Sequence, residues 1–90
     1  MRLTEFIDEE IEVSISQKPG PPTSFVWREN EYKITEIRQM RRVLDFKAAW
    51  WRRRHRDYYV VKTDAGEAFE IYFHRGFGRR YWVLLRRLEE

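Results

Sequence analysis

The sequence predicts a mainly β protein that folds as one small antiparallel barrel. Runs of β-branched and aromatic residues alternate with polar residues, which gives a period of two in several segments. Turn-forming residues separate the last three runs at intervals of about eight to ten residues. Short strands at this spacing are typical of small barrels and sandwiches, and about five or six of them fit a partly open barrel of the SH3-like kind.

An acidic strand or arm is expected first, over residues 1–16. Ile11, Val13 and Ile15 alternate with polar residues, as in a half-buried strand. Residues 17–24 hold three prolines and a glycine, so we expect a loop there. The β core is expected over residues 25–88, within a single domain of residues 1–90, because a chain of 90 residues is too short for two domains.

A hairpin is expected at the start of this core, with strands near 24–28 and 31–38. Its turn is predicted at Glu29-Asn30-Glu31, because Asn tolerates a positive φ.

Residues 36–51 allow two interpretations. Apolar residues recur there at helical spacings of three and four, whereas the run just before them favours a strand. We expect the strand to continue to about Arg42 and an irregular or short helical stretch to follow, up to Trp51. One short helix over 38–50 is the alternative.

A three-stranded meander is expected to complete the core. The run 58–63 is rich in β-formers, 68–74 alternates apolar and polar residues, and 81–85 is the last strand. Residues 64–67 and 75–79 contain the glycines expected in the two turns between them.

The charge is distributed unevenly along the chain. Residues 1–37 carry a net charge of −4 and residues 38–90 a net charge of +7, and Arg outnumbers Lys by 14 to 4. Arginine presents a planar fork that binds phosphate or carboxylate at two points, so its excess favours recognition of such groups.

Several function classes are excluded by what the chain lacks. There is no Cys, and His55 and His74 are nineteen residues apart, so neither a metal site nor a bound cofactor is expected. No nucleophile and base stand in a recognisable motif, and the protein is therefore not expected to be an enzyme. The absence of disulfides in so small a domain fits a cytoplasmic setting. No apolar run approaches the roughly 20 residues needed to cross a bilayer, and the N-terminus lacks the apolar region of a signal peptide, so no membrane contact is expected.

The densest functional signal is the run from Trp50 to Tyr59, which holds four aromatic residues and four arginines. Aromatic rings provide platforms for bases, and arginines bind phosphates, so this composition is typical of a nucleic-acid surface. The Gly-containing segment 75–80 adds three further arginines around an aromatic residue. The residues expected to contact phosphate are Arg52, Arg53, Arg54, Arg56, Arg79 and Arg80, and those expected to stack on bases are Trp50, Tyr58 and Phe77.

Two alternatives stay open for these residues. The aromatic rings could belong to the core or to a surface that docks a protein partner or a second copy of the chain, because aromatic residues and Arg also dominate protein interfaces. The acidic residues near the N-terminus are expected to form a solvated face, or else to lie over the basic half of the chain and compete with a polyanion.

The pattern of aromatic strands resembles a small uncharacterised bacterial domain family that also occurs as a tail on accessory Y-family DNA-polymerase-like proteins. The resemblance covers about residues 25–85 and is carried by the runs 25–28, 32–37, 50–51, 56–61, 69–72 and 81–84. It implies a link to DNA damage tolerance, and it assigns no functional residues.

Overall fold

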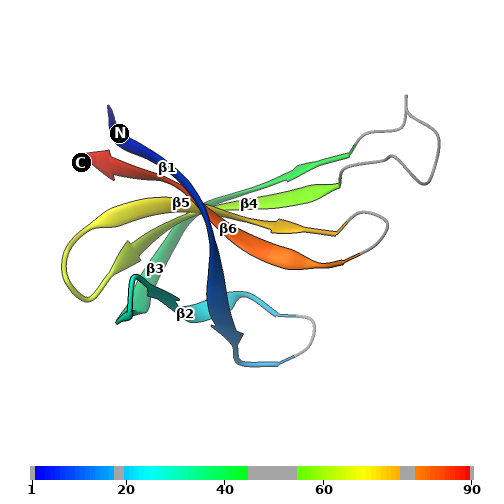
Figure 1. Cartoon of the computed structure of the whole chain (residues 1–90), viewed down its shortest axis with the longest axis horizontal. Helices are drawn as coiled ribbons and strands as arrows, with labels where there is room; N and C mark the ends of the chain where they lie inside the picture. The colour runs from blue at the N-terminus through cyan, green and yellow to red at the C-terminus, as the bar shows by residue number, and fades with distance from the viewer. Residues whose placement is uncertain (1, 18–19, 45–54, 76–78, 90) are drawn as a thin grey trace.

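The protein is an all-β barrel in the computed structural model, which describes residues 2–17, 20–44, 55–75 and 79–89. The strands are β1 (Arg2–Ile15), β2 (Pro22–Trp27), β3 (Asn30–Val43), β4 (Arg56–Thr63), β5 (Ala68–His74) and β6 (Tyr81–Glu89). Each strand pairs antiparallel with the next, and β6 pairs with β1, which closes the barrel (Figure 1). The prediction of a mainly β small barrel is confirmed. In the part of the chain that the structure describes, no helix has the length and apolar character needed to cross a membrane.

The barrel closes instead of staying partly open, because β1 pairs with both β6 and β2. Residues Arg2–Ile11 pair with β6, and Glu12–Ile15 pair with β2, so one strand bridges both neighbours. The period of two was visible only from Ile11 onward, since acidic residues occupy alternate positions before it. The expected acidic strand or arm is therefore a strand, whose first part pairs with β6 and whose last part pairs with β2. Strand β2 begins at Pro22, inside the segment expected to be a loop.

The interpretation of residues 38–43 as helix is wrong, because they continue β3 up to Val43. The helical spacing has a physical cause in two β-bulges. The pairing of β3 with β4 shifts between Ile34 and Glu36 and again between Ile37 and Gln39. An extra residue at a bulge resets the alternation, so Ile37 and Met40, three residues apart, lie on the same face. Positions 45–50 lie outside the described residues.

The core lies inside the barrel and consists of inward-facing apolar side chains. Its buried members are Ile11, Phe25, Trp27, Val61, Phe69, Ile71 and Leu84. The rings of Phe25 and Tyr32 stack with centroids 5.1 Å apart, and Phe69 meets Phe25 edge-on at 5.5 Å. Aromatic side chains thus supply much of the buried surface that a chain of this size needs.

The two ends of the barrel differ. One end, which we call the turn end, carries the tight turns Arg28-Glu29 and 64–67. The first of these turns has positive φ angles of 50° and 70°, so it lies one or two residues before the predicted position. The other end, which we call the open end, carries the longer connections after β1, β3 and β5 (Figure 1).

Candidate functional site

A cavity of about 1040 Å³ lies at the open end of the barrel. Its apolar wall consists of inward-facing side chains near the ends of strands. The described residues that line it are Val13, Ile15, Gly20, Arg42, Asp57, Tyr59, Phe73, Arg75, Arg80 and Trp82. Cavities of this size hold small organic ligands, and a few polar groups around an apolar wall orient them.

Three aromatic rings form one side of the cavity. Trp82 on β6 lies between Tyr59 and Phe73, with ring centroids 5.7 Å and 4.9 Å away. The strand pairing causes this, because Phe73 is directly opposite Trp82 across the β5–β6 ladder. Burial raises the pKa of the Tyr59 hydroxyl, and the nearby carboxylate of Asp57 raises it further. The hydroxyl is therefore neutral and available as a hydrogen-bond donor.

Charged side chains surround the cavity. Asp57, which is only 5% exposed, accepts a hydrogen bond from Nε of Arg42 at 3.0 Å, and its other carboxylate oxygen lies 3.1 Å from Nε of Arg75. One carboxylate thus lies between two guanidinium groups. Arg80 is exposed beside them, and no carboxylate of the described residues lies within ion-pair distance of it. The described charges around the cavity therefore sum to an excess of positive charge.

A second group of arginines and aromatic rings covers the outward face of β4, β5 and β6. Arg41 lies over the ring of Tyr58 and Arg56 over that of Tyr72, each 4.6 Å from the ring centroid. Arg56 also donates a hydrogen bond to the hydroxyl of Tyr58, which raises the pKa of the guanidinium. We call this group, which also contains Arg79 over Tyr81, the arginine–tyrosine layer.

The structure describes four of the site residues that were predicted from the sequence. Arg56 and Tyr58 belong to the arginine–tyrosine layer, where Arg41 covers one face of the Tyr58 ring. Arg79 donates two hydrogen bonds to the carboxylate of Glu10, at 3.0 and 2.5 Å, and Arg80 lies at the cavity. The other predicted residues, Trp50, Arg52, Arg53, Arg54 and Phe77, lie outside the described residues.

Apart from Arg80, the residues that line the cavity were not among those predicted from the sequence. Asp57, Tyr59, Val61 and Thr63 alternate toward the inside of the barrel, so the period of two in β4 could have placed Asp57 and Tyr59 inward. Arg42 and Arg75 contact Asp57 only because the ends of their strands meet at the open end of the barrel. Local sequence does not show which strand ends meet.

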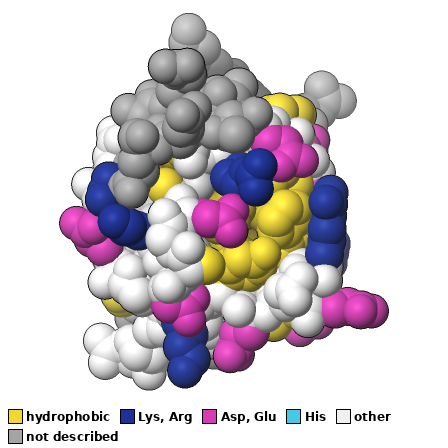
Figure 2. All heavy atoms as spheres, turned by 90° about the vertical axis from the view of Figure 1, so that its left-hand side faces the viewer, with side chains coloured by type: hydrophobic (Ala, Val, Ile, Leu, Met, Phe, Trp, Pro, Cys, Tyr) yellow, Lys and Arg dark blue, Asp and Glu magenta, His cyan; other side chains and the backbone are white. Residues whose placement is uncertain are grey.

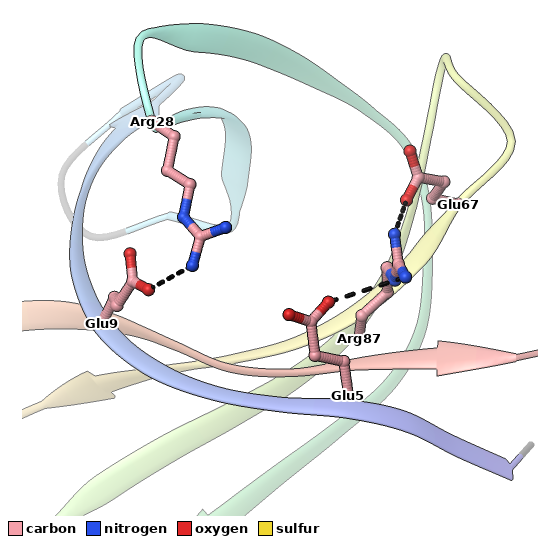
Figure 3. A network of polar contacts seen from close by, with 5 residues as sticks. All are labelled: Glu5, Glu9, Arg28, Glu67 and Arg87. Atoms are coloured by element: carbon pink, nitrogen blue, oxygen red, sulfur yellow. Dashed lines mark hydrogen bonds and ion pairs between the residues drawn. The ribbon is translucent and has the colours of Figure 1, made fainter.

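Three acidic residues of β1, namely Glu5, Glu9 and Glu10, are paired with arginines of other segments. At the turn end, Glu9 lies 2.7 Å from Arg28, and Arg87 contacts both Glu5, at 3.6 Å, and Glu67, at 3.3 Å (Figure 3). Figure 2 shows this end, where acidic and basic side chains border a hydrophobic patch. The turn end is therefore electrostatically compensated, in contrast to the cavity.

Glu10, by comparison, points outward and pairs with Arg79. The hydrogen bonds from Arg79 lower the pKa of Glu10, so its carboxylate is charged at neutral pH. A carboxylate bound at two points by an arginine has the geometry of a bound phosphate. The expectation that acidic residues of β1 compete with a polyanion stays a prediction, and Arg79 is the arginine at which it can be tested.

Comparisons with known proteins give a family and nothing further. No curated protein and no solved structure matches the chain. A family model described as a domain of unknown function (DUF6504) matches residues 1–89, which is almost the whole chain and includes β1. The chain therefore belongs to the DUF6504 family.

Proposed function

We propose that this protein is a non-catalytic nucleic-acid-binding domain that takes an unpaired base of a single strand into the cavity at the open end. The observation that carries the proposal is the combination of an aromatic wall and a surplus of arginines in one cavity. Single-stranded nucleic acids are recognised by this combination, because rings stack on bases and cations track the backbone.

The aromatic wall provides the base contact. Trp82 is half-buried and lies between two other rings, so it is held in place before a ligand arrives. A ring that is already ordered loses little conformational entropy on binding, and stacking contributes about 1–3 kcal/mol per base.

The arginines provide the phosphate contacts. Arg80 has no acidic partner among the described residues and is the first candidate. Arg42 and Arg75 are held by Asp57 through Nε, and a guanidinium group bound in this way still has donors at its terminal nitrogens. Asp57 thus acts as a positioning residue for two phosphate-binding side chains.

The biological setting belongs to the same proposal. The resemblance to a bacterial family that also occurs behind polymerase-like proteins supports a role as an accessory in DNA repair or damage tolerance. A domain that binds exposed single strands would suit that role, since such strands accompany damaged DNA.

The test is a fluorescence-anisotropy titration of labelled single- and double-stranded oligonucleotides at about 50 and 200 mM salt, a range over which phosphate contacts weaken strongly. The variants are Arg80→Ala and Trp82→Leu, and Lys33→Ala is the control with a matched loss of one charge. Lys33 is exposed on β3 near the turn end. A circular dichroism melt of each variant shows whether it folds.

We expect tighter binding of the single strand and a steep salt dependence. Arg80→Ala should reduce the slope of log affinity against log salt by roughly 0.7, the value for one phosphate contact on a single strand, whereas Lys33→Ala should leave it unchanged. Absence of binding at the lower salt concentration, or equal effects of Arg80→Ala and Lys33→Ala, would overturn the proposal.

A further inference from the structure

Strand β3 carries a long edge that no described strand covers. Its pairing with β2 ends at the pair Ser24–Lys33, whereas its pairing with β4 continues from Ile34 to Val43. Over residues 34–43 the backbone is therefore paired on one side only among the described residues. Every side chain from Thr35 to Val43 is exposed, in contrast to β4 and β5.

This edge also concentrates exposed apolar side chains. Ile37 is 37% exposed, Met40 46% and Val43 39%, and Leu44 follows directly after the strand. An unpaired edge with apolar side chains pairs readily with another strand, and small proteins normally protect such edges with charges or bulges. Here three arginines lie among the apolar residues, so the edge accepts only a strand whose charges complement them.

The strand itself meets this requirement. We propose that the β3 edge binds the β3 edge of a second copy of the chain, antiparallel, with the twofold axis between Arg38 and Gln39. In this register Ile37 lies opposite Met40 of the second copy, and Glu36 lies opposite Arg41 of the second copy. Twofold symmetry repeats both pairs, so two apolar contacts and two ion pairs form around one axis.

The faces of the sheet agree with this register. Ile37 is opposite Val61 and Met40 is opposite Tyr59, so both side chains lie on the inward face of the sheet. Glu36 is opposite Lys62 and Arg41 is opposite Tyr58, on the outward face.

In the two neighbouring registers, these residues no longer meet partners of suitable charge on the same face of the sheet. A shift of one residue in one direction places Arg38 opposite its own copy, which brings like charges together. A shift in the other direction places Ile37 opposite Arg41, on the wrong face. The bulge near Arg38 is thus what allows one register to match both faces.

Glu36 and Arg41 can give up their present ion-pair partners to pair with each other across the dimer. Glu36 now pairs with Arg38 of its own strand, at 3.2 Å, and both side chains are exposed. Arg41 lies 3.9 Å from Glu70, which Arg86 also contacts at 3.0 Å. Glu70 therefore keeps a partner when Arg41 turns to Glu36 of the second copy.

The absence of cysteine from the sequence makes disulfide trapping a clean test. The variants Ile37→Cys and Met40→Cys are prepared separately, mixed in equal amounts and oxidised with diamide. Residues directly opposite across an antiparallel ladder lie within the distance that a disulfide spans. We expect roughly tenfold more covalent dimer in the mixture than in either variant alone, because pairing raises the effective concentration of the two thiols.

Two control variants distinguish this register from its neighbours. Arg38→Cys and Gln39→Cys each lie opposite their own copy only in the two shifted registers, so rapid dimer formation by either variant alone overturns the proposal. Equal dimer yields in all samples indicate random collision and also overturn it. Sedimentation of the unmodified protein at increasing concentration gives an independent measurement, in which a purely monomeric species up to millimolar concentration contradicts the proposal.

A charge exchange tests the ion pair. Glu36→Arg or Arg41→Glu alone should weaken dimerisation in the sedimentation experiment, and the double variant should restore it. Arg42 belongs both to this edge and to the lining of the cavity, but none of the residues changed in these tests lines the cavity. A failure of the dimer can therefore be distinguished from a failure of the proposed nucleic-acid binding.

Discussion

Trp27 donates its indole N–H to the carboxylate of Glu9 at 3.1 Å, from β2 to β1 at the turn end of the barrel. The indole ring belongs to the core, whereas the carboxylate is also bound by Arg28. Glu9 can therefore keep its charge on the inward face of β1, because its carboxylate oxygens accept hydrogen bonds from Trp27 and Arg28.

The pKa of Glu9 is lowered, first by the hydrogen bond from Arg28 and then by that from Trp27. A carboxyl group whose pKa is lower in the folded protein stabilises the fold above its ordinary value of 4.5, and this contribution disappears as the pH falls through the lowered value. We therefore expect Glu9→Gln to melt at a lower temperature than the unmodified protein at pH 7. The difference should shrink below pH 4.5, and calorimetry at several pH values measures it. A difference that does not diminish as the pH falls below 4.5 would contradict the assigned cause.

The pair Glu10–Arg79 gives a prediction about binding. If Glu10 occupies a phosphate-binding arginine, Glu10→Gln should release Arg79 and tighten single-strand binding by roughly three- to tenfold, the effect of one additional phosphate contact. Glu12→Gln is the matched control, since Glu12 lies on the same exposed face of β1 and the change in charge is identical. Anisotropy titrations of both variants at the same salt concentration decide the question. Equal gains in the two variants would show a general effect of charge and no competition by Glu10.

Most of the fold could be predicted from the sequence, because strands with one buried face leave a period of two. The first half of β1 did not show this pattern, since Glu5 and Glu9 occupy positions where apolar residues are expected. Their ion pairs with Arg87 and Arg28 depend on the closure of the barrel, which local sequence does not reveal. The strand was therefore recognised only from Ile11.

The site was less predictable than the fold. The density of arginines identified the chemistry, and Arg80 was among the predicted residues that the structure places at the cavity. The aromatic wall was missed because Tyr59, Phe73 and Trp82 lie on three strands and meet only through their register. Composition reveals which groups are available, whereas the pairing of strands decides which of them share a cavity.

Asp57 holds two arginines of the cavity, Arg42 and Arg75, through one carboxylate. Asp57→Asn removes the charge between Arg42 and Arg75 and leaves two guanidinium groups close together, so we expect a loss of about 1–3 kcal/mol in the free energy of unfolding. Urea denaturation measures the loss, and Glu12→Gln, an exposed change of equal charge, is the control with an expected effect near zero. The predicted loss should also become smaller in phosphate buffer, because the anion can take the place of the carboxylate. A variant as stable as the unmodified protein in both buffers would show that Asp57 does not hold these arginines.

The turn between β2 and β3 holds two residues in an unfavourable backbone conformation, and a substitution to glycine can relieve this strain. Arg28 and Glu29 both have positive φ, at 50° and 70°, which only glycine adopts readily. The two-residue turn requires this conformation, since its twist matches that of the paired strands. Glu29 is exposed and its side chain takes part in no ion pair with a described residue, so Glu29→Gly should stabilise the fold by about 0.5–1 kcal/mol.

The control is Glu31→Gly, two residues later on β3. It should destabilise the fold by a similar amount, because glycine in a strand loses more backbone entropy on folding. Thermal and urea denaturation of the two variants side by side measure both effects. Destabilisation by both changes would mean that the backbone of Glu29 adopts an ordinary strand or helical conformation in solution.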